Sequence, residues 1–300
     1  MNFPLFRRLL ARIIRLDHVY VRRAMNSADR QTVAAAWLRL RSRLGAIAFR
    51  NPVFPTTDSP NLWIAGLLGR GHVYFDVGAN AGETLSVAVA RLGKSGEAHA
   101  FEPNPRTFAN LSSLVRLAGW RNIRLTNAAV AAEAGEVTLF CPPSNPSSSL
   151  SRAFIAHIPD DQVSSVQCPA ITLDSYWKQL GLKSLTLMKI DVEGAELPAL
   201  RGSERMIESF RPYLVVEVTD SNARELAFGY RTVELLGYLM DRNFALFHMV
   251  GGRVHPLKRP EDWVESTHDV CAIPREKLER EEVRRLFKVR RPRTETSFAS

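Results

Sequence analysis

The chain predicts a doubly wound α/β fold, in which helices cover both faces of a mostly parallel sheet of seven strands. Three observations lead to this prediction. An apolar segment, residues 73–77, runs directly into a glycine loop, short apolar segments then alternate with helical ones up to residue 274, and several of the apolar segments end at an acidic side chain. With 300 residues, 45% of them hydrophobic, the chain is long enough to bury a sizeable core.

The first expected strand ends in a loop with glycines at positions 78 and 82, and a helix over 83–92 follows. Glycine tolerates φ > 0 and carries no side chain, so such a loop lets backbone N–H groups approach a ligand. The expected ligand-binding residues of this segment are Asp76, Gly78, Asn80, Gly82, Glu83 and Thr84. A dinucleotide loop has its acid about 20 residues after the glycines. Here Asp76 precedes them, and a carboxylate there favours a cationic ligand such as S-adenosylmethionine (SAM) over NAD.

The remaining elements follow from apolar runs and from helix start and stop signals. Asn104 is the expected N-cap of a helix that has Pro105 at its first position and runs to Gly119. The second expected strand covers residues 98–101, and the third is bracketed by 123–125 and 128–130. Further strands are expected over 137–140, 185–190, 213–218 and 269–274. A Pro- and Ser-rich loop is expected over 142–151, and a short helix is expected to begin at 172. A parallel sheet of this kind binds its ligand at the carboxyl ends of the strands.

Two strand ends are expected to hold the nucleoside part of the ligand. Glu102 ends the second strand, and a carboxylate there can accept hydrogen bonds from both hydroxyls of a ribose. Asn127 and Ala128 follow the third strand and are expected to border an adenine, whose ring edge a side-chain amide can read. Asn104 completes the expected binding set.

The second motif lies at the end of the strand over 185–190. Lys189, Asp191, Glu193 and Glu196 crowd this strand exit, and packing acids there is costly unless they bind a cation, take up a proton or form hydrogen bonds. Glu193 and Glu196 could simply favour the N-terminus of a following helix. That alternative does not account for Lys189 or Asp191, which indicates a reactive site.

Together these segments resemble the FkbM family of SAM-dependent methyltransferases. The resemblance covers residues 73–274 and rests on these motifs in this order: Phe75-Asp76-Val77-Gly78-Ala79-Asn80-Ala81-Gly82, Phe101-Glu102-Pro103-Asn104-Pro105, Asn127-Ala128-Ala129, Thr172-Leu173-Asp174, Lys189-Ile190-Asp191-Val192-Glu193-Gly194-Ala195-Glu196, Val215-Val216-Glu217 and Asp269-Val270-Cys271-Ala272-Ile273-Pro274. It implies a class I methyltransferase fold, SAM as cofactor, and a small-molecule or glycan hydroxyl as acceptor. In one respect the chain departs from the family, because many relatives have a histidine where this chain has Thr219.

The expected reaction is an in-line displacement, in which a hydroxyl oxygen attacks the methyl group on sulfur. Asp191 or Glu193 is the expected general base, and Lys189 is expected to orient the carboxylate or the acceptor. A magnesium ion held by Asp191 and Glu193 is an alternative, since hard oxygen ligands suit it, but no metal is expected because no histidine lies nearby. The Ser147-Ser148-Ser149 loop and residues 220–231 are expected to border the acceptor, and His248 and His268 are more typical of ordinary strand ends.

Charge is concentrated at the ends of the chain. Residues 1–50 hold eleven arginines and two aspartates, a net charge equal to the +9 of the whole chain. The expected division is an Arg-rich helical extension over 1–50, a Pro-rich linker and entry segment over 51–71, the catalytic domain over 72–274, and a charged, disordered tail over 275–300. Residues 3–16 form an amphipathic pattern that fits packing on this domain or a second subunit, peripheral contact with a membrane, or a targeting signal.

Composition weighs against several other classes. Cys141, Cys168 and Cys271 are too few and too far apart to indicate a disulfide framework or a zinc site, and no apolar run reaches the roughly 18 residues of a membrane span. A cytoplasmic protein is therefore expected. Because the basic residues lie at the ends, and the motifs of base methylation are missing, no nucleic-acid partner is expected. Nucleic-acid methylation, an NAD-linked oxidoreductase and a non-catalytic adaptor docked to a membrane are the competing functions, and the oligomeric state is not readable.

Overall fold

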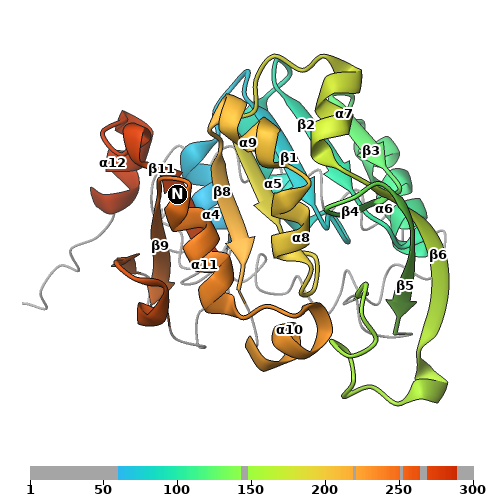
Figure 1. The fold of residues 1–300 in the computed structure, drawn as a ribbon. Coiled ribbons are helices and arrows are strands. Elements are labelled where there is room, and N and C mark those ends of the chain that lie inside the picture. Colours follow the sequence, from blue (N-terminus) through green and yellow to red (C-terminus); the bar gives the residue numbers. More distant parts are fainter. Residues whose placement is uncertain (1–59, 143–147, 219–220, 251–252, 264–268, 289–300) are drawn as a thin grey trace, which may run out of the picture.

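The computed structural model describes residues 60–142, 148–218, 221–250, 253–263 and 269–288. An eight-stranded sheet forms the middle layer (Figure 1). Its strands are β1 (Val73–Val77), β2 (Glu97–Phe101), β3 (Ile123–Thr126), β7 (Leu187–Ile190), β8 (Tyr213–Glu217), β9 (Phe244–Val250), β10 (Arg253–Leu257) and β11 (Asp269–Pro274). They lie in the order β10-β9-β11-β8-β7-β1-β2-β3.

The topology confirms the predicted doubly wound, mostly parallel sheet. β1 pairs in parallel with β2 on one side and with β7 on the other, so the chain order reverses at β1. In folds of this class such a switch point is where ligands bind. β11 runs antiparallel to both of its neighbours. Seven strands were expected in this sheet, but the expected strand over 137–140 lies in a second sheet, and β9 and β10 are additional. β10 pairs antiparallel with β9 at the sheet edge, where Pro256 is tolerated because an edge strand leaves some N–H groups unpaired.

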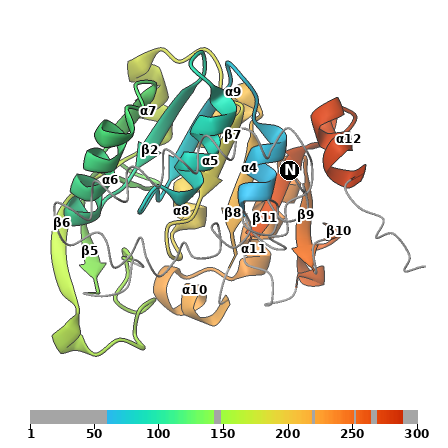
Figure 2. The same ribbon diagram turned by 180° about the vertical axis from the view of Figure 1, so that it is seen from behind.

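Helices cover both faces of the sheet (Figures 1 and 2). One face packs on α7 (Leu173–Leu180), α8 (Glu196–Arg201), α9 (Glu204–Phe210) and α11 (Thr232–Asp241), with Leu173, Leu197 and Leu236 in a common core with Phe75. The other face packs on α4 (Pro60–Leu67), α5 (Glu83–Leu92) and α6 (Pro105–Ala118). Burial from both sides explains why the central strands are apolar runs rather than alternating patterns.

A second, three-stranded sheet follows β3. It consists of β4 (Ala129–Val130), β5 (Gly135–Cys141) and β6 (Ser164–Ile171) in the order β4-β6-β5. The expected third strand is therefore two strands in different sheets, because Asn127 donates its side-chain amide to the carbonyls of Glu102 and Pro103 and turns the chain between them. Figure 1 shows β5 and β6 extending away from the main sheet.

Two segments that were expected to lie outside the domain belong to its core. Within the expected linker, α4 buries Trp63 and Ile64 completely or nearly so. Within the tail, α12 (Glu281–Lys288) buries Val283 and packs Leu286 against Gly66 of α4. The charge of the tail suggested disorder, but Val283 and Leu286 are three residues apart and so share one face of the helix. The Arg-rich segment over 3–16, the linker up to 59 and the tail over 289–300 lie outside the described residues.

The predicted starts of two helices are confirmed. The Asn104 side chain caps α6 by accepting from the backbone N–H groups of Arg106 and Thr107, and Thr172 caps α7 by accepting from Ser175 N. The helices α8 to α11 and the strands β6, β9 and β10 were not predicted individually. None of the helices in the described parts of the chain has the length and apolar character required to cross a membrane.

Candidate functional site

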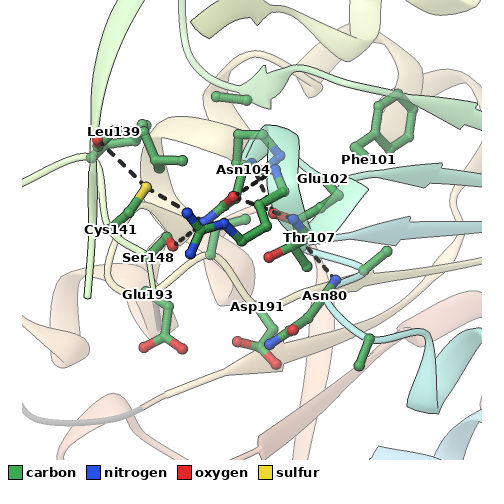
Figure 3. A pocket seen from close by; sticks show the side chains of 18 of the residues that line it. Asn80, Phe101, Glu102, Asn104, Thr107, Leu139, Cys141, Ser148, Asp191 and Glu193 are labelled. Carbon is green, nitrogen blue, oxygen red and sulfur yellow. Dashed lines mark hydrogen bonds between the residues drawn. The ribbon is translucent and has the colours of Figure 1, made fainter. Parts of the chain in front are cut away.

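A pocket of about 1200 Å³ opens at the carboxyl ends of β1, β2 and β7, and the small sheet borders it (Figure 3). Ten of the thirteen predicted site residues line it: Gly78, Asn80, Glu83, Thr84, Glu102, Asn104, Ala128, Lys189, Asp191 and Glu193. In the view of Figure 3, Glu102 and Asn104 lie on one side of the pocket and Asp191 and Glu193 on the other. The pocket is larger than one small ligand requires, since ligand sites are typically about 300–1000 Å³.

The glycine loop is held tightly against the end of β7. Gly78 has φ +79°, and a Cβ there would lie 1.8 Å from the carbonyl oxygen of Asp191, so only glycine fits. Gly82 has φ +82° and begins α5 without lining the pocket. Asn80 also has positive φ and donates its backbone N–H to Glu102 Oε2 at 2.9 Å. The loop thus joins the ends of β1, β2 and β7 around one space.

Asp76 occupies a different place from the one expected. Its carboxylate is fully buried beneath the loop and accepts hydrogen bonds from Thr84 Oγ1 at 2.9 and 3.2 Å, while the Lys189 ammonium lies 4.0 Å away. Burial raises the pKa of Asp76, and Lys189 and Thr84 partly oppose this. The expected direct contact with a cationic ligand is therefore replaced by a structural role, in which Asp76 anchors α5 to β1.

Glu102 both holds the neighbouring backbone in place and lines the pocket. Its two carboxylate oxygens accept from the backbone N–H groups of Asn80 and Asn104, each at 2.9 Å, and only 6% of the residue is exposed. Burial raises the pKa of Glu102 to about 7, and the two backbone hydrogen bonds oppose the rise. Because each carboxylate oxygen has a second lone pair, Glu102 can still accept from hydroxyls in the pocket that it lines.

Asn104 extends this side of the pocket toward the small sheet. While its side-chain oxygen caps α6, its amide nitrogen contacts Ser148 Oγ at 3.0 Å and Cys141 Sγ at 3.4 Å. Ala128 lines the pocket as expected. Asn127 does not, because its amide is used by the two carbonyls after β2, so it stabilises that turn where we expected it to read an adenine edge.

Lys189 and Asp191 form the charged pair of the site. The Lys189 ammonium is nearly buried, 2.8 Å from Asp191 Oδ2 and 3.4 Å from the carbonyl oxygen of Gly78. Burial alone would lower the pKa of Lys189, but the carboxylates of Asp191 and Asp76 outweigh it and raise the pKa above its usual value. The ammonium is therefore a permanent cation. Asp191 keeps 32% of its side chain exposed and faces the pocket (Figure 3).

Glu193 and Glu196 separate into two environments. Glu193 has φ +53°, lines the pocket, and its carbonyl oxygen accepts from Ser149 Oγ at 2.9 Å. Glu196 is fully buried and is paired with the Arg224 guanidinium, with the nearest atoms 3.0 Å apart. The helix α10 (Ser221–Phe228), which carries Arg224, is thereby joined to the site, and Glu196 is a structural residue.

The sequence analysis missed several groups near the site. Glu217 ends β8 and Asp269 begins β11, and the two are paired across these strands. Both are acids at strand ends, the signal that identified Glu102 and Asp191. Asp161 and Gln162 line the pocket from the 3₁₀ turn Asp160–Gln162, which no sequence signal indicated.

Other expected contacts have these outcomes. Among the described residues, His248 lies on β9 beside His255 and does not line the pocket. Within the same part of the chain, no group of three or more His, Cys, Asp or Glu side chains is arranged to hold a metal ion. Ser147, Thr219 and His268 lie outside the described residues.

The arrangement is suited to binding a nucleoside-containing ligand beside a basic carboxylate. One side offers an acceptor for ribose hydroxyls at Glu102 and a polar edge at Asn104, and the other offers Asp191 held by an ammonium. The backbone of the glycine loop lies between them. These groups and the volume fit SAM, whose ribose and sulfonium methyl group would need to reach opposite sides of the pocket.

Comparisons with known proteins agree with this geometry. The family model described as "Methyltransferase FkbM domain" matches residues 76–246, more than half of the chain. No protein among the curated sequences matches the chain.

Three solved structures are among those to which the chain is similar. The methyltransferase FkbM from Methylobacillus flagellatus KT is 16% identical with a TM-score of 0.42; the match covers 83% of this chain but only 56% of that protein. A putative rRNA methylase from Clostridium thermocellum is 8% identical with a TM-score of 0.43, and the match covers 71% and 92% of the two chains. Fibrillarin from Aeropyrum pernix, which was solved with natively bound SAM, is 16% identical with a TM-score of 0.40, and the match covers 79% and 76%.

Proposed function

Because the chain belongs to the FkbM family of methyltransferases, which take their methyl group from SAM, we propose that it methylates a hydroxyl oxygen of a sugar, glycan or natural product. One observation carries this proposal. At the pocket edge opposite the predicted ribose site, Asp191 is a partly exposed carboxylate fixed by a buried ammonium 2.8 Å away. A neutral hydroxyl is a poor nucleophile, and such a carboxylate can remove its proton.

The donor would be held by groups that the fold already aligns. The two carboxylate oxygens of Glu102 would accept hydrogen bonds from the ribose hydroxyls. Both oxygens are already fixed at the pocket wall by hydrogen bonds from the backbone N–H groups of Asn80 and Asn104. The loop from Gly78 to Asn80 brings main-chain atoms close to the ligand because it has no bulky side chain at Gly78. When bound, SAM supplies an electrophilic methyl group on a sulfonium.

Asp191 then acts on the acceptor. It takes the hydroxyl proton as the oxygen bonds to the methyl carbon, and the bond between that carbon and sulfur breaks, so the positive charge of the sulfonium is neutralised as the carboxylate becomes neutral. Lys189 binds Oδ2 and leaves Oδ1 for the acceptor. Alignment alone lowers such a barrier by about 7–11 kcal/mol, and a general base contributes about 10²–10⁴-fold.

The polar lining of the pocket supports a polar acceptor. Ser148, Thr107 and Gln162 line the same pocket, which has room for a second ligand beside the donor. Hydroxyl and amide groups at these positions can exchange hydrogen bonds with the several hydroxyls of a sugar. Ser149 donates a hydrogen bond to the main-chain carbonyl of Glu193, which joins the segment after β5 to the segment that carries Asp191.

The test is a transfer assay with methyl-labelled SAM, preceded by calorimetric titration with SAM and with NAD. We expect SAM to bind and NAD not to bind, and label to appear as a base-stable methyl ether on an acceptor from a panel of sugars, glycans and phenolic natural products. Purified tRNA and rRNA serve as competing acceptors. Label only in RNA would contradict the proposal, and so would binding of NAD without binding of SAM.

A further inference from the structure

Glu217, the last residue of β8, has no assigned part in this site. The β7 and β8 strands pair in parallel with Ile190 opposite Val216, so Asp191 and Glu217 are the next residues along the two strands. Across the other edge of β8, Glu217 is paired with Asp269 of β11. The side chain of Glu217 therefore lies in a row of acids behind the floor of the pocket, next to the proposed base.

The Glu217 side chain is half-buried and lies among like charges. Its Oε2 atom is inaccessible to solvent and has no hydrogen-bond partner among the described residues at standard geometry. The charged groups that interact with it are Asp191 at the exit of β7, Glu193 and Glu196 from the following segment, and Arg224 from α10, and Asp269 of β11 is its neighbour across the strands. The Lys189 ammonium faces the adjoining Asp191 and Asp269.

Both cations near Glu217 are engaged by other carboxylates, and the attraction between Arg224 and Glu217 is weaker than that between Arg224 and Glu196. The Lys189 ammonium is bound to Asp191 at 2.8 Å. Arg224 gives its guanidinium to Glu196 through two nitrogens, and what it donates to Glu217 is a hydrogen bond to the main-chain carbonyl at 3.1 Å. A carboxyl that has one inaccessible oxygen, acids on several sides and no ion pair among the described residues favours its neutral, protonated form.

From this arrangement, and given the proposed methyl transfer, we infer that Glu217 is a positioning residue that carries a proton and donates it as a hydrogen bond to Asp191. The neutral Glu217 and the Lys189 ammonium would then hold the Asp191 carboxylate from two directions and fix its orientation. Burial and the surrounding acids, Asp191 first among them, raise the pKa of Glu217 far above the usual range, and its protonated form is placed to hydrogen-bond with Asp191. Burial likewise raises the pKa of Asp269 to about 7.

A proton on Glu217 would orient Asp191 for the proposed reaction. An ionised Glu217 would repel the Asp191 carboxylate and leave its orientation to Lys189 alone. A neutral Glu217 adds a second donor without adding charge, so one oxygen of Asp191 stays directed at the acceptor. Glu217 itself does not line the pocket, which is why it acts through Asp191 and not on the acceptor.

The first measurement needs no acceptor and no donor. Carbon-13 NMR of the side-chain carboxyls in protein labelled at glutamate is followed against pH, and the Glu217 signal is assigned as the one lost in E217Q. We expect this signal to keep the chemical shift of a protonated carboxyl at pH 7 and to change only at alkaline pH. E208Q, which alters an exposed glutamate of α9, controls the assignment. An ionised Glu217 at pH 7 would overturn the inference.

The second measurement uses the acceptor found in the transfer assay. Glutamine is isosteric with a protonated glutamate and can donate the same hydrogen bond, so E217Q should recover most of the activity that E217A loses. We expect E217A to lower kcat about tenfold to a hundredfold, as for a lost hydrogen bond to a charged group. The kcat of the wild type should fall at alkaline pH as Glu217 ionises, and that fall should be missing in E217Q.

The outcomes separate the two proposals. If E217Q is as inactive as E217A while both remain folded, Glu217 works as an ionised group and the inference is wrong. If no hydroxyl acceptor is methylated, the proposed function fails, but the NMR titration still decides whether Glu217 holds a proton. A merely structural Glu217 would lower thermal stability in E217A without changing the pH profile of kcat.

Discussion

Two acidic clusters lie within a few residues of each other at the end of β7, and they differ in how fully their charges are paired. Glu196 accepts from the backbone N–H groups of Val192 and Gly194, each at 3.1 Å, and from Arg224 on its other oxygen. Asp191 has one ion pair, with Lys189, and acidic neighbours at Glu217 and Asp269. Glu196 is fully buried, whereas Asp191 remains partly open to the pocket.

This difference separates structure from chemistry within one motif. A carboxylate whose oxygens are all satisfied is already in its lowest-energy state and has no lone pair to offer a substrate. A carboxylate held on one side and open on the other can still accept a proton or a hydrogen bond. The loop over 191–196 therefore places a structural acid and a reactive acid five residues apart.

Replacing Asp191 should give the largest effect on activity. Asp191→Asn keeps the shape of the side chain but removes its capacity to take a proton, so we expect kcat for methyl transfer to fall about 10²–10⁴-fold. SAM affinity by calorimetry should change little, because the donor is held mainly at Glu102. Asp241→Asn, at an exposed position on α11, is the control. Near-normal turnover in Asp191→Asn would remove Asp191 as the base.

Removing the cation that pairs with Glu196 should instead lower the free energy of unfolding. Arg224→Met leaves the Glu196 carboxylate buried without its cation, and such a loss costs about 3–5 kcal/mol. Urea unfolding of the wild type and the variant measures the difference. The double variant Arg224→Met with Glu196→Gln should recover part of it, since no unpaired charge is then left buried. If Arg224→Met unfolds like the wild type, Glu196 is not the structural partner described here.

The sequence could predict the reactive residues but not the difference between the clusters. Acids at strand ends were visible as residue types, and the parallel order of the strands made their proximity predictable. What decided the role of each acid was its partner. Arg224 lies 28 residues after Glu196, and no local pattern connects them.

The same limit explains the residues that were placed incorrectly. Asp76 was expected to face the ligand, yet Thr84, in the first turn of the next helix, hydrogen-bonds to both of its oxygens. Asn127 was expected to contact a base, but the carbonyls of the neighbouring strand end were closer. In both cases a short polar side chain satisfies nearby backbone or helix groups first, which a linear reading of strand ends does not show.

Glu102 is buried, as Glu196 is, but it lines the pocket, as Asp191 does. We therefore expect replacing Glu102 to have an effect of intermediate size. We expect Glu102→Gln to weaken SAM binding about tenfold or more, because a neutral amide accepts from only one oxygen and forms weaker hydrogen bonds. Since the pKa of Glu102 is raised to about 7, the wild-type affinity should increase with pH between about 6 and 8 as the carboxyl ionises. Calorimetry across this range should show no such increase in Glu102→Gln.

The pH dependence of folding should have the opposite sign at the same residue. An acid whose pKa is raised on folding contributes stability that is fully present below its unfolded pKa and is lost as pH rises through about 7. The free energy of unfolding without ligand should therefore fall over the range in which donor affinity rises, and Glu102→Gln should reduce both slopes. Slopes of equal sign would mean that another group controls donor binding.

The smallest effect is expected at Asn104, where one side chain serves both stability and binding. Asn104→Ala removes the N-cap of α6 and should lower the free energy of unfolding by about 1 kcal/mol. Asn104→Asp keeps the capping oxygen but loses the amide that contacts Ser148 and Cys141, so it should unfold like the wild type. If the contact with the small sheet shapes the pocket, Asn104→Asp should still weaken SAM binding. Equal losses of stability in the two variants would show that the amide, and not the cap, is what α6 requires.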